Sequence, residues 1–467
     1  MDSIIQKTIY SEQGRKWFQL FVFMGAIFIS LFVATQDLDT RLVYGILAMP
    51  GLIVGGLLLL RFPQLGFLLI VVISTVVKFD IPPIGLVATL ILGLTALWIF
   101  DMVVRQKRIA LVDSSTMAPL FAFTAVVILA LIVGQLPWFS VSQVNLDTQI
   151  GGTAIFILSF AAFILVAHQV RDVRWLKWMV FLYLILAVPL LLIGLQVPGW
   201  WEMSQVVLNY STVGGSLFWL WLSVLAFSQG LFNKQLPMKW RIALVILLLA
   251  YLYRAFVMNR AWTSGWAPVL VALFVTLWVA RPKWAMPITM IGVAILILMF
   301  QPIYNGVMIG DNEYSTITRV AAWEIVLRIA RVNPILGLGP GNYYNYTLLY
   351  PILGWYVRFN SHNNYVDILA QTGIAGMAVF FWFVFVTWKL GWRLRNQVPK
   401  DGFTQAFIYG ALGGLAGGVV AAMFGDWVLP FVFNIGIYGM RASVYFWLFL
   451  GGLVAIDQMR RAGIPLD

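Results

Sequence analysis

The chain has 467 residues, of which 61% are hydrophobic and only 10% are charged, and its mean hydropathy is +0.90. Soluble globular proteins carry about 25% charged residues, so this composition excludes a soluble domain and predicts a polytopic membrane protein. The chain contains no cysteine, which excludes disulfide bonds and thiolate metal sites. The net charge of +12 is expected from basic cytoplasmic loops and does not indicate nucleic-acid binding.

Apolar runs along the chain predict fourteen membrane spans, because a spanning helix needs about 20 mostly apolar residues. The runs cover 17–34, 42–60, 63–77, 84–103, 117–135, 152–169, 178–195, 214–232, 242–258, 267–280, 285–301, 367–388, 404–424 and 440–456. A polar segment precedes the first run, which we expect to be a spanning helix and not a cleavable signal peptide. The short third run leaves twelve spans with re-entrant segments as an alternative. The predicted fold class is an all-α integral membrane protein with about 12–14 transmembrane helices.

The lysines and arginines predict the orientation of these spans. With the N-terminus in the cytoplasm, 21 of the 30 basic residues fall inside and the other 9 outside, as the positive-inside rule requires. Eight of the nine external residues are arginine, whose planar guanidinium suits phosphate oxygens, although contact with lipid headgroups is the alternative for any single one. The nine are Arg41, Lys78, Arg254, Arg260, Arg319, Arg328, Arg331, Arg358 and Arg441.

One large external loop, over 303–366, separates the N-terminal spans (1–302) from the C-terminal spans (367–467). Residues 315–332 have helical spacing, and Asn333-Pro334 is expected to end that helix. Its predicted apolar face consists of Ile317, Val320, Ala321, Ile325, Val326 and Ile329. A glycine-rich turn at 337–344 follows. It either presents backbone N–H groups to an anion or reverses the loop, and the reversal is favoured.

His362 is one of only two histidines, and it is the only one in a predicted external segment. A single loop histidine is more often an ordinary surface residue than a catalyst. However, its unperturbed pKa of about 6.5 suits proton abstraction near neutral pH, and arginines precede it in the loop. Asp37 and Asp39 form a D-x-D pair in the first external loop, which we interpret as an acidic turn in preference to a metal site.

Four stretches of the chain resemble the O-antigen ligase/polymerase superfamily of polytopic glycosyltransferases. They are 258–262 (MNRAW), 318–324 (TRVAAWE), 333–343 (NPILGLGPGNY) and 361–376 (SHNNYVDILAQTGIAG). The last two, in this order and followed directly by a span, are the more specific. The chain departs from the family at Asn259, where a serine is common, and at Gln371, where a glutamate is frequent.

The resemblance implies a GT-C-like architecture and a bacterial inner-membrane enzyme of lipopolysaccharide or exopolysaccharide biosynthesis, with its active site facing the periplasm. It implies transfer of a glycan from undecaprenyl diphosphate to a hydroxyl of a glycan or lipid acceptor, with inversion and without metal or cofactor. His362 matches the essential histidine of the family, and Arg260 and Arg319 match its two essential arginines. The residues we expect to contact the substrate are Arg254, Arg328, Arg441, Asn363, Gly339, Gly341 and Tyr343.

Two other functions stay open from the sequence. A transporter or flippase of lipid-linked glycans is the alternative from another class, although the predicted spans place no carboxylate near mid-membrane and the chain has no P-loop pattern. A protein O-oligosaccharyltransferase would use the same donor chemistry. The sequence does not separate ligase from polymerase, nor does it identify the sugars, the acceptor or the oligomeric state.

Overall fold

The computed structural model describes residues 51, 54–78, 80–81, 84–202, 214–307 and 312–467. The chain divides into two units, Met1–Phe62 and Pro63–Asp467, and the second contains nearly all of the described residues. The predicted spans 17–34 and 42–60 lie wholly or mostly outside the described residues, as do Arg41 and the pair Asp37 and Asp39. Within the described part the chain is helical, with a single isolated bridge between Ile352 and Trp355 and no β-strand.

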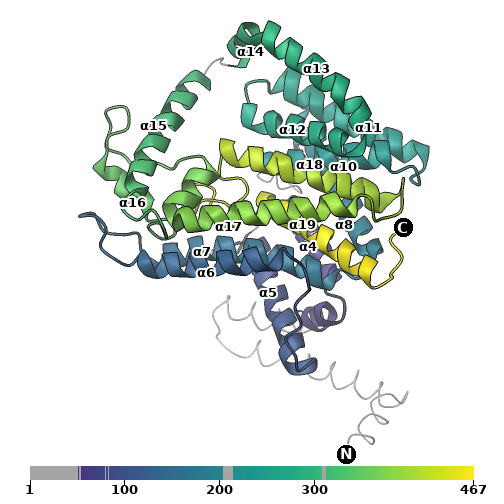
Figure 1. The fold of residues 1–467 in the computed structure, drawn as a ribbon, viewed down its shortest axis with the longest axis horizontal. Coiled ribbons are helices and arrows are strands. Elements are labelled where there is room, and N and C mark those ends of the chain that lie inside the picture. The colour runs from purple at the N-terminus through teal and green to yellow at the C-terminus, as the bar shows by residue number, and fades with distance from the viewer. Residues whose placement is uncertain (1–50, 52–53, 79, 82–83, 203–213, 308–311) are drawn as a thin grey trace, which may run out of the picture. The chain divides into compact units, whose positions relative to one another are not determined.

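Every apolar run predicted from residue 63 onward coincides with a helix (Figure 1). Before the large loop these are α4 (Gln64–Thr75), α5 (Leu86–Phe100) with the π-helical turn η1 (Asp101–Arg105), α6 (Met117–Val133), α7 (Leu146–Gln169), α8 (Val173–Gly194), α10 (Ser216–Phe232), α11 (Met238–Tyr253) with the π-helical turn η3 (Arg254–Met258), α12 (Thr263–Ala280) and α13 (Pro282–Leu298). After the loop come α17 (Asn364–Leu394), α18 (Phe403–Phe424), the 3-10 turn η5 (Ile437–Gly439) and α19 (Met440–Arg461).

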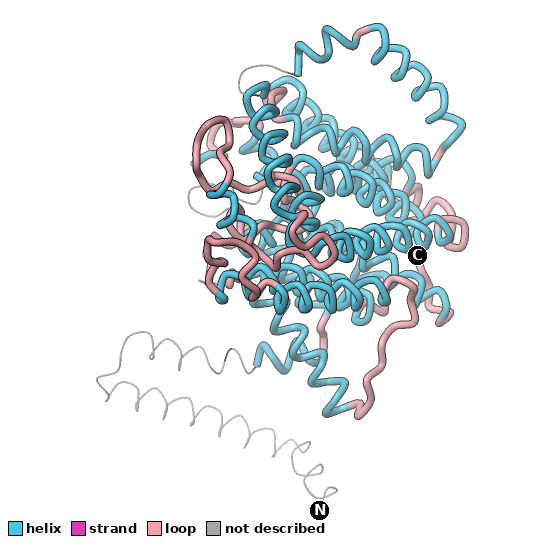
Figure 2. Tube along the Cα trace, turned by 60° about the vertical axis from the view of Figure 1, so that its left-hand side comes forward, coloured by secondary structure: helices cyan, strands magenta, loops and turns pink. Residues whose placement is uncertain are grey.

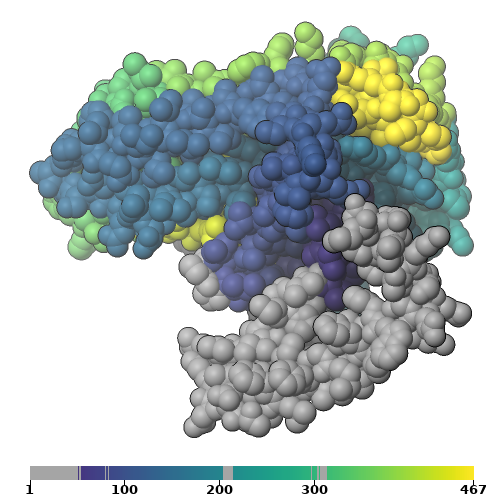
Figure 3. Space-filling view, turned by 90° about the horizontal axis from the view of Figure 1, so that it is seen from below, coloured from purple at the N-terminus to yellow at the C-terminus, as the bar shows by residue number. Residues whose placement is uncertain are grey.

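Eight helices in the described residues are long and apolar enough to cross a membrane, which confirms an all-α, multi-pass membrane protein. Outer helices expose apolar side chains where a soluble protein would expose polar ones. On α6, for example, Phe121 is 43% and Ile132 61% exposed, and α6 and α7 together cover one face of the unit (Figure 3). Such exposed apolar helix faces are what contact with lipid requires.

Small residues allow the central helices to pack closely. Helix α19 is buried along most of its length, and so is α10. A side chain placed at Gly414 of α18 would overlap Trp221 of α10, and one at Gly418 would overlap Phe446 of α19. Glycines at these positions therefore bring α18 against both neighbours, which is a common device in helix packing within membranes.

The connections between helices gather at two opposite ends of the bundle (Figure 2). At one end, the ion pairs Lys234–Asp401 (2.9 Å) and Arg461–Asp113 (3.1 Å) join loops that the sequence assigns to the cytoplasm. At the other, Asn342 of the large loop donates to the carbonyl oxygen of Gly134 at the end of α6 (3.0 Å). Loops predicted to lie on opposite sides of the membrane thus lie at opposite ends of the helices.

The large loop is itself helical. It contains α14 (Phe300–Val307), α15 (Asn312–Ala330), the short α16 (Tyr343–Tyr346) and the 3-10 turn η4 (Thr347–Leu349). The helix predicted at 315–332 is confirmed as α15. Its predicted apolar face is wrong in the first half, because Ile317 and Val320 are each 52% exposed, whereas Ile325, Val326 and Ile329 are buried. Only the later turns of α15 are covered by the small core that the loop forms with α16 and α17.

The glycine-rich turn lies against a break in α17. Gly373 has a φ of +67°, and this interruption frees backbone groups of α17 to pair with the turn. The N–H of Gly339 donates to the carbonyl oxygen of Gln371 (3.1 Å), and the N–H of Gly341 donates to the side-chain oxygen of Gln371 (3.0 Å). These amides are therefore engaged within the protein, which favours the interpretation of the turn as a loop reversal.

Candidate functional site

A buried cluster in the large loop supports the segment that carries His362. It joins Val326 and Ile329 of α15 to Tyr343 of α16 and to Phe431, which lies in the connection between α18 and α19. The rings of Tyr343 and Phe431 stack with centroids 4.9 Å apart. Two connections that are distant in sequence, the large loop and the connection between α18 and α19, thus share one core beneath the candidate site.

Ser361 anchors the chain immediately before the histidine. Its side chain is fully buried and its hydroxyl donates to Oδ1 of Asp367 (2.7 Å), which also accepts from the hydroxyl of Tyr343 (2.5 Å). The indole of Trp323 on α15 donates to the carbonyl oxygen of Ser361 (2.7 Å). This network fixes the backbone at position 361 from both sides.

Asn363 fixes the chain immediately after the histidine, because it caps the N-terminus of α17. Its side-chain oxygen accepts from the N–H groups of Tyr365 (2.9 Å) and Val366 (3.4 Å). Between these two anchors His362 has a φ of +50°, a left-handed conformation that is uncommon outside glycine. Strain of this kind persists where the surroundings over-determine it, and it clusters at functional sites.

The ring of His362 is half-buried and lies within electrostatic range of Arg319 and Asp426. Burial lowers the pKa of His362 from its ordinary value, the carboxylate of Asp426 raises it, and the guanidinium of Arg319 lowers it. Neither ring nitrogen hydrogen-bonds to another residue in the part of the chain that the structure describes. A half-exposed, mostly neutral imidazole of this kind is available to accept a proton.

Arg319 and Asp426 approach the histidine from different elements. Nη1 of Arg319, on α15, donates to the carbonyl oxygen of Phe424 at the end of α18 (3.1 Å), and burial lowers the pKa of this arginine. Asp426 follows α18 directly and is 2% exposed. Its carboxylate accepts from the N–H of Phe431 (2.8 Å) and from the amide of Asn434 (2.7 Å), while burial raises its pKa.

Asp426 was not among the residues that the sequence predicted for the site. It lies more than sixty positions after His362 and outside the four stretches that carry the family resemblance. The only signal for it in the sequence is an acidic residue immediately after an apolar, glycine-rich span, near the predicted external face. Its proximity to His362 depends on the packing of the connection between α18 and α19 against the loop.

Arg260 lies at the same end of the bundle as Arg319. A side chain at Gly413 or Gly417 of α18 would meet the backbone of Ala272 or Pro268 of α12, so these two helices run antiparallel in contact. The start of α12, which Arg260 precedes, therefore lies beside the end of α18, which Arg319 contacts. The side chain of Arg260 is exposed and makes no hydrogen bond or ion pair with a described residue. The structure thus brings Arg319 and His362 together and leaves Arg260 nearby without a direct bond to either.

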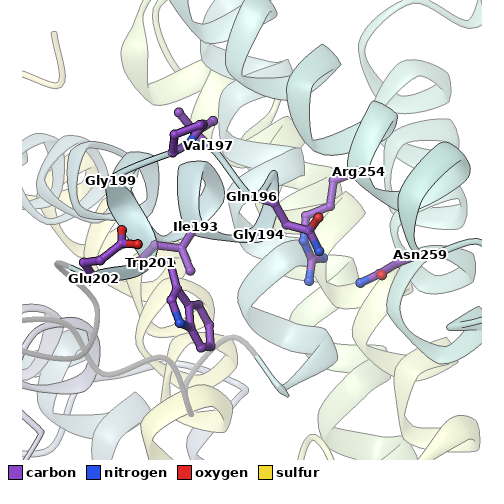
Figure 4. Close-up of a pocket in the computed structure, with 10 residues that line it drawn as sticks. Ile193, Gly194, Gln196, Val197, Gly199, Trp201, Glu202, Arg254 and Asn259 are labelled. Atoms are coloured by element: carbon purple, nitrogen blue, oxygen red, sulfur yellow. The ribbon is translucent and has the colours of Figure 1, made fainter.

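Arg254 lines a separate pocket of about 480 Å³ with Gln196, Glu202 and Asn259 (Figure 4). The arginine is 4% exposed and lies 4.4 Å from the ring centroid of Trp219. With its amide oxygen turned toward the guanidinium, Asn259 accepts from Nη2 of Arg254 at 3.1 Å.

The other predicted substrate contacts are engaged within the protein. Arg441 bonds to Asp80 (3.0 Å) and to the carbonyl oxygens of Ile73 and Val77, so it ties the start of α19 to α4. Arg328 forms an exposed ion pair with Glu324 (3.1 Å). The bonds already described for Asn363, Gly339, Gly341 and Tyr343 favour roles in positioning the loop.

No group of three or more His, Cys, Asp or Glu side chains in the described residues is arranged to hold a metal ion. The acidic pair Asp37 and Asp39 falls outside those residues.

Residues 242–381 match the sequence model of a family described as O-Antigen ligase. This segment is similar to the O-antigen ligase family. It contains all four stretches on which the resemblance was predicted, together with Arg254, Arg260, Arg319 and His362, and it ends within α17, before Asp426. A search of curated proteins found no match. The match to the family model supports a function of the O-antigen ligase or polymerase type for the matched segment.

Proposed function

We propose that the chain transfers a glycan from undecaprenyl diphosphate to a hydroxyl acceptor at the periplasmic face of the inner membrane. The observation that carries this proposal is the juxtaposition of His362, Arg319 and Asp426 at the end of the bundle where Arg260 also lies. A proton acceptor beside fixed cations is what the reaction needs, because one reactant must lose a proton while the other gains negative charge.

In the proposed reaction, His362 takes the proton of the acceptor hydroxyl as its oxygen attacks the anomeric carbon of the donor sugar. The bond between that carbon and the diphosphate oxygen breaks, and its electron pair leaves with the diphosphate. Arg319 and Arg260 stabilise the charge that develops there, an effect worth roughly 3 kcal/mol for a well-placed donor. A single displacement of this kind inverts the anomeric centre.

Asp426 acts on this reaction through the histidine. Once His362 has accepted a proton it is a cation close to the cation of Arg319, which is unfavourable in a half-buried site. The carboxylate of Asp426, held by Phe431 and Asn434, offsets that repulsion. We therefore assign Asp426 a positioning and electrostatic role without contact to the substrate.

Replacing His362 with alanine tests the proposal most directly. We expect transfer to fall by roughly 10²–10⁴-fold, the contribution of a general base, with little change in melting temperature. The matched control is His168→Gln at the opposite end of the bundle, which we expect to lower stability but to leave the rate per folded molecule near wild type. Transfer by His362→Ala at the wild-type rate would rule out this histidine as the base.

The proposed chemistry assigns to arginines the task that a divalent metal performs in many glycosyltransferases. We therefore expect transfer by the purified protein to survive EDTA and to survive substitution of Asp37 and Asp39 by asparagine. Loss of transfer in EDTA, restored by added divalent cation, would instead assign the acidic pair to a metal site.

Product analysis separates the remaining alternatives. With a defined lipid-linked repeat, a polymerase gives a ladder of lengths, and a ligase gives one transfer to a distinct lipid acceptor. A protein O-oligosaccharyltransferase gives a glycosylated Ser or Thr. A flippase moves the lipid-linked glycan without releasing undecaprenyl diphosphate, so detection of that product excludes it.

A further inference from the structure

The pocket beside Arg254 contains a buried cation without an acidic partner. Nε and Nη1 of Arg254 are buried and form no hydrogen bond, and no carboxylate in the described residues forms an ion pair with this side chain. The stretch 203–213, which follows the pocket residues in the chain, contains no Asp or Glu. A buried charge left unpaired is costly, so a site that retains one is a candidate for binding an anion.

The backbone around Arg254 is adapted to hold it in place. The π-helical turn η3 begins at this residue, with the N–H of Asn259 donating to the carbonyl oxygen of Arg254 (2.8 Å). Turns of this kind inside helices are frequent at functional sites. A side chain at Gly194, at the end of α8, would overlap the guanidinium, so this glycine provides the space in which Arg254 lies.

The rest of the lining suits a sugar more than a bare phosphate. Gln196 and Asn259 line the pocket with amides that can bond hydroxyl groups (Figure 4). The volume of about 480 Å³ falls within the roughly 300–1,000 Å³ of typical ligand pockets, which is more space than a phosphate group fills.

The carboxylate of Glu202 makes the pocket less favourable for an anion that carries several negative charges than for one that carries a single charge. This carboxylate lines the wall away from Arg254 (Figure 4), so the pocket carries one positive and one negative side chain. A diphosphate would bring two or three negative charges toward this carboxylate, which disfavours it. A sugar with one carboxylate would pair that group with Arg254 and could donate its hydroxyls to Glu202.

We propose that this pocket is a specificity subsite for a monoanionic sugar, one bearing a carboxylate, within the glycan that the enzyme handles. The inference rests on the proposed function, since a glycan substrate is what brings such a sugar to this end of the bundle. The pocket and the His362 centre are distinct, because none of the described residues that line the pocket is His362, Arg319 or Asp426. Arg254 selects the sugar, while His362 acts on the acceptor hydroxyl.

Binding measured without turnover tests this subsite independently of transfer. Saturation-transfer NMR on the full chain in detergent would use methyl glucuronide, with methyl glucoside and inorganic phosphate as comparisons. We expect methyl glucuronide to bind, methyl glucoside to bind at least tenfold more weakly, and phosphate not to displace the glucuronide. Equal binding of the two glycosides, displacement by phosphate, or no binding of the glucuronide would each overturn the proposal.

Variants connect the binding to the pocket. Arg254→Gln should weaken glucuronide binding about tenfold or more. The control variant Arg331→Gln, at an exposed arginine outside the pocket, should bind glucuronide with the wild-type affinity. If Arg254→Gln fails to fold, Asn259→Leu tests the same subsite from an exposed position and should also weaken binding. Unchanged binding in the folded variant would overturn the assignment. His362→Ala should bind glucuronide normally, so failure of the proposed reaction and failure of this subsite give different results.

Discussion

The two histidines of the chain differ in how their ring nitrogens are used. In His168, Nε2 accepts from the N–H of Val112 (2.7 Å) and Nδ1 lies 2.9 Å from the carbonyl oxygen of Ile164, so both nitrogens have partners within the bundle. Around His362, the hydrogen bonds are made by the flanking residues Ser361 and Asn363 and not by the ring itself. The chain around His362 is fixed while its ring stays available, an arrangement typical of a reactive side chain held by a rigid support.

The pKa of His362 gives a pH prediction with a definite sign. A general base must be unprotonated, and burial lowers the pKa of this ring below 6.5. We therefore expect the transfer rate to be nearly constant at pH 7 and above and to fall as the pH decreases through the lowered pKa. The rate of transfer at saturating donor, measured between pH 4.5 and 8, checks this expectation. A decline that begins above pH 7 would contradict it.

Asp426→Asn should shift the pH at which the transfer rate falls. The carboxylate raises the pKa of His362, so its removal lowers the pKa further and shifts the fall in rate to lower pH. At neutral pH the variant should be slower than wild type, because the protonated histidine loses a stabilising partner. If Asp426 had only a structural role, the variant would give less folded protein, but the pH at which its transfer rate falls would stay the same.

At the scale of elements, the break in α17 connects the helix to the candidate site. Gly373 has a positive φ, and the freed N–H of the next residue, Ile374, donates to the carbonyl oxygen of Pro334 (2.8 Å). The turn that follows Pro334 leads into α16, whose Tyr343 supports Ser361. The position of His362 thus depends on a glycine eleven residues further along the chain.

Gly373→Ala should destabilise the protein. An alanine in this left-handed conformation costs about 1–2 kcal/mol, and its Cβ would also overlap the carbonyl group of Ile335. We expect a melting temperature lower by several degrees in detergent, together with reduced transfer. Gly292→Ala in α13 is the matched control, since a Cβ there meets nothing within 4 Å and should leave the melting temperature unchanged or slightly higher. Equal melting temperatures for the two variants would show that the break is not required.

At the scale of the whole molecule, the separation of loops to two ends of the bundle agrees with the predicted alternation of loops between the two sides of the membrane. Basic residues such as Lys234 and Arg461 lie at one end and the His362 segment lies at the other. We propose that the first end faces the cytoplasm, as the excess of lysine and arginine there indicates.

The absence of cysteine makes this orientation easy to measure. A single cysteine at Trp355, which is 73% exposed in the large loop, should react with an impermeant maleimide in intact spheroplasts. A single cysteine at the exposed Lys400, in the connection between α17 and α18, should react only after permeabilisation. The reverse pattern would invert the topology and place the candidate site in the cytoplasm.

The sequence by itself determined the membrane class, the positions of the described helices and the segment that matches the family, and it predicted the histidine with its arginines as the candidate site. These follow from local properties: apolar length, charge bias, and motifs whose residues are close in the chain. The structure alone decided that Asp426 lies beside His362, that Arg441 and the glycine turn are engaged within the protein, and that Arg254 is a buried cation in a pocket. Each of these depends on which distant segments pack together, and hydropathy and spacing do not encode such pairings.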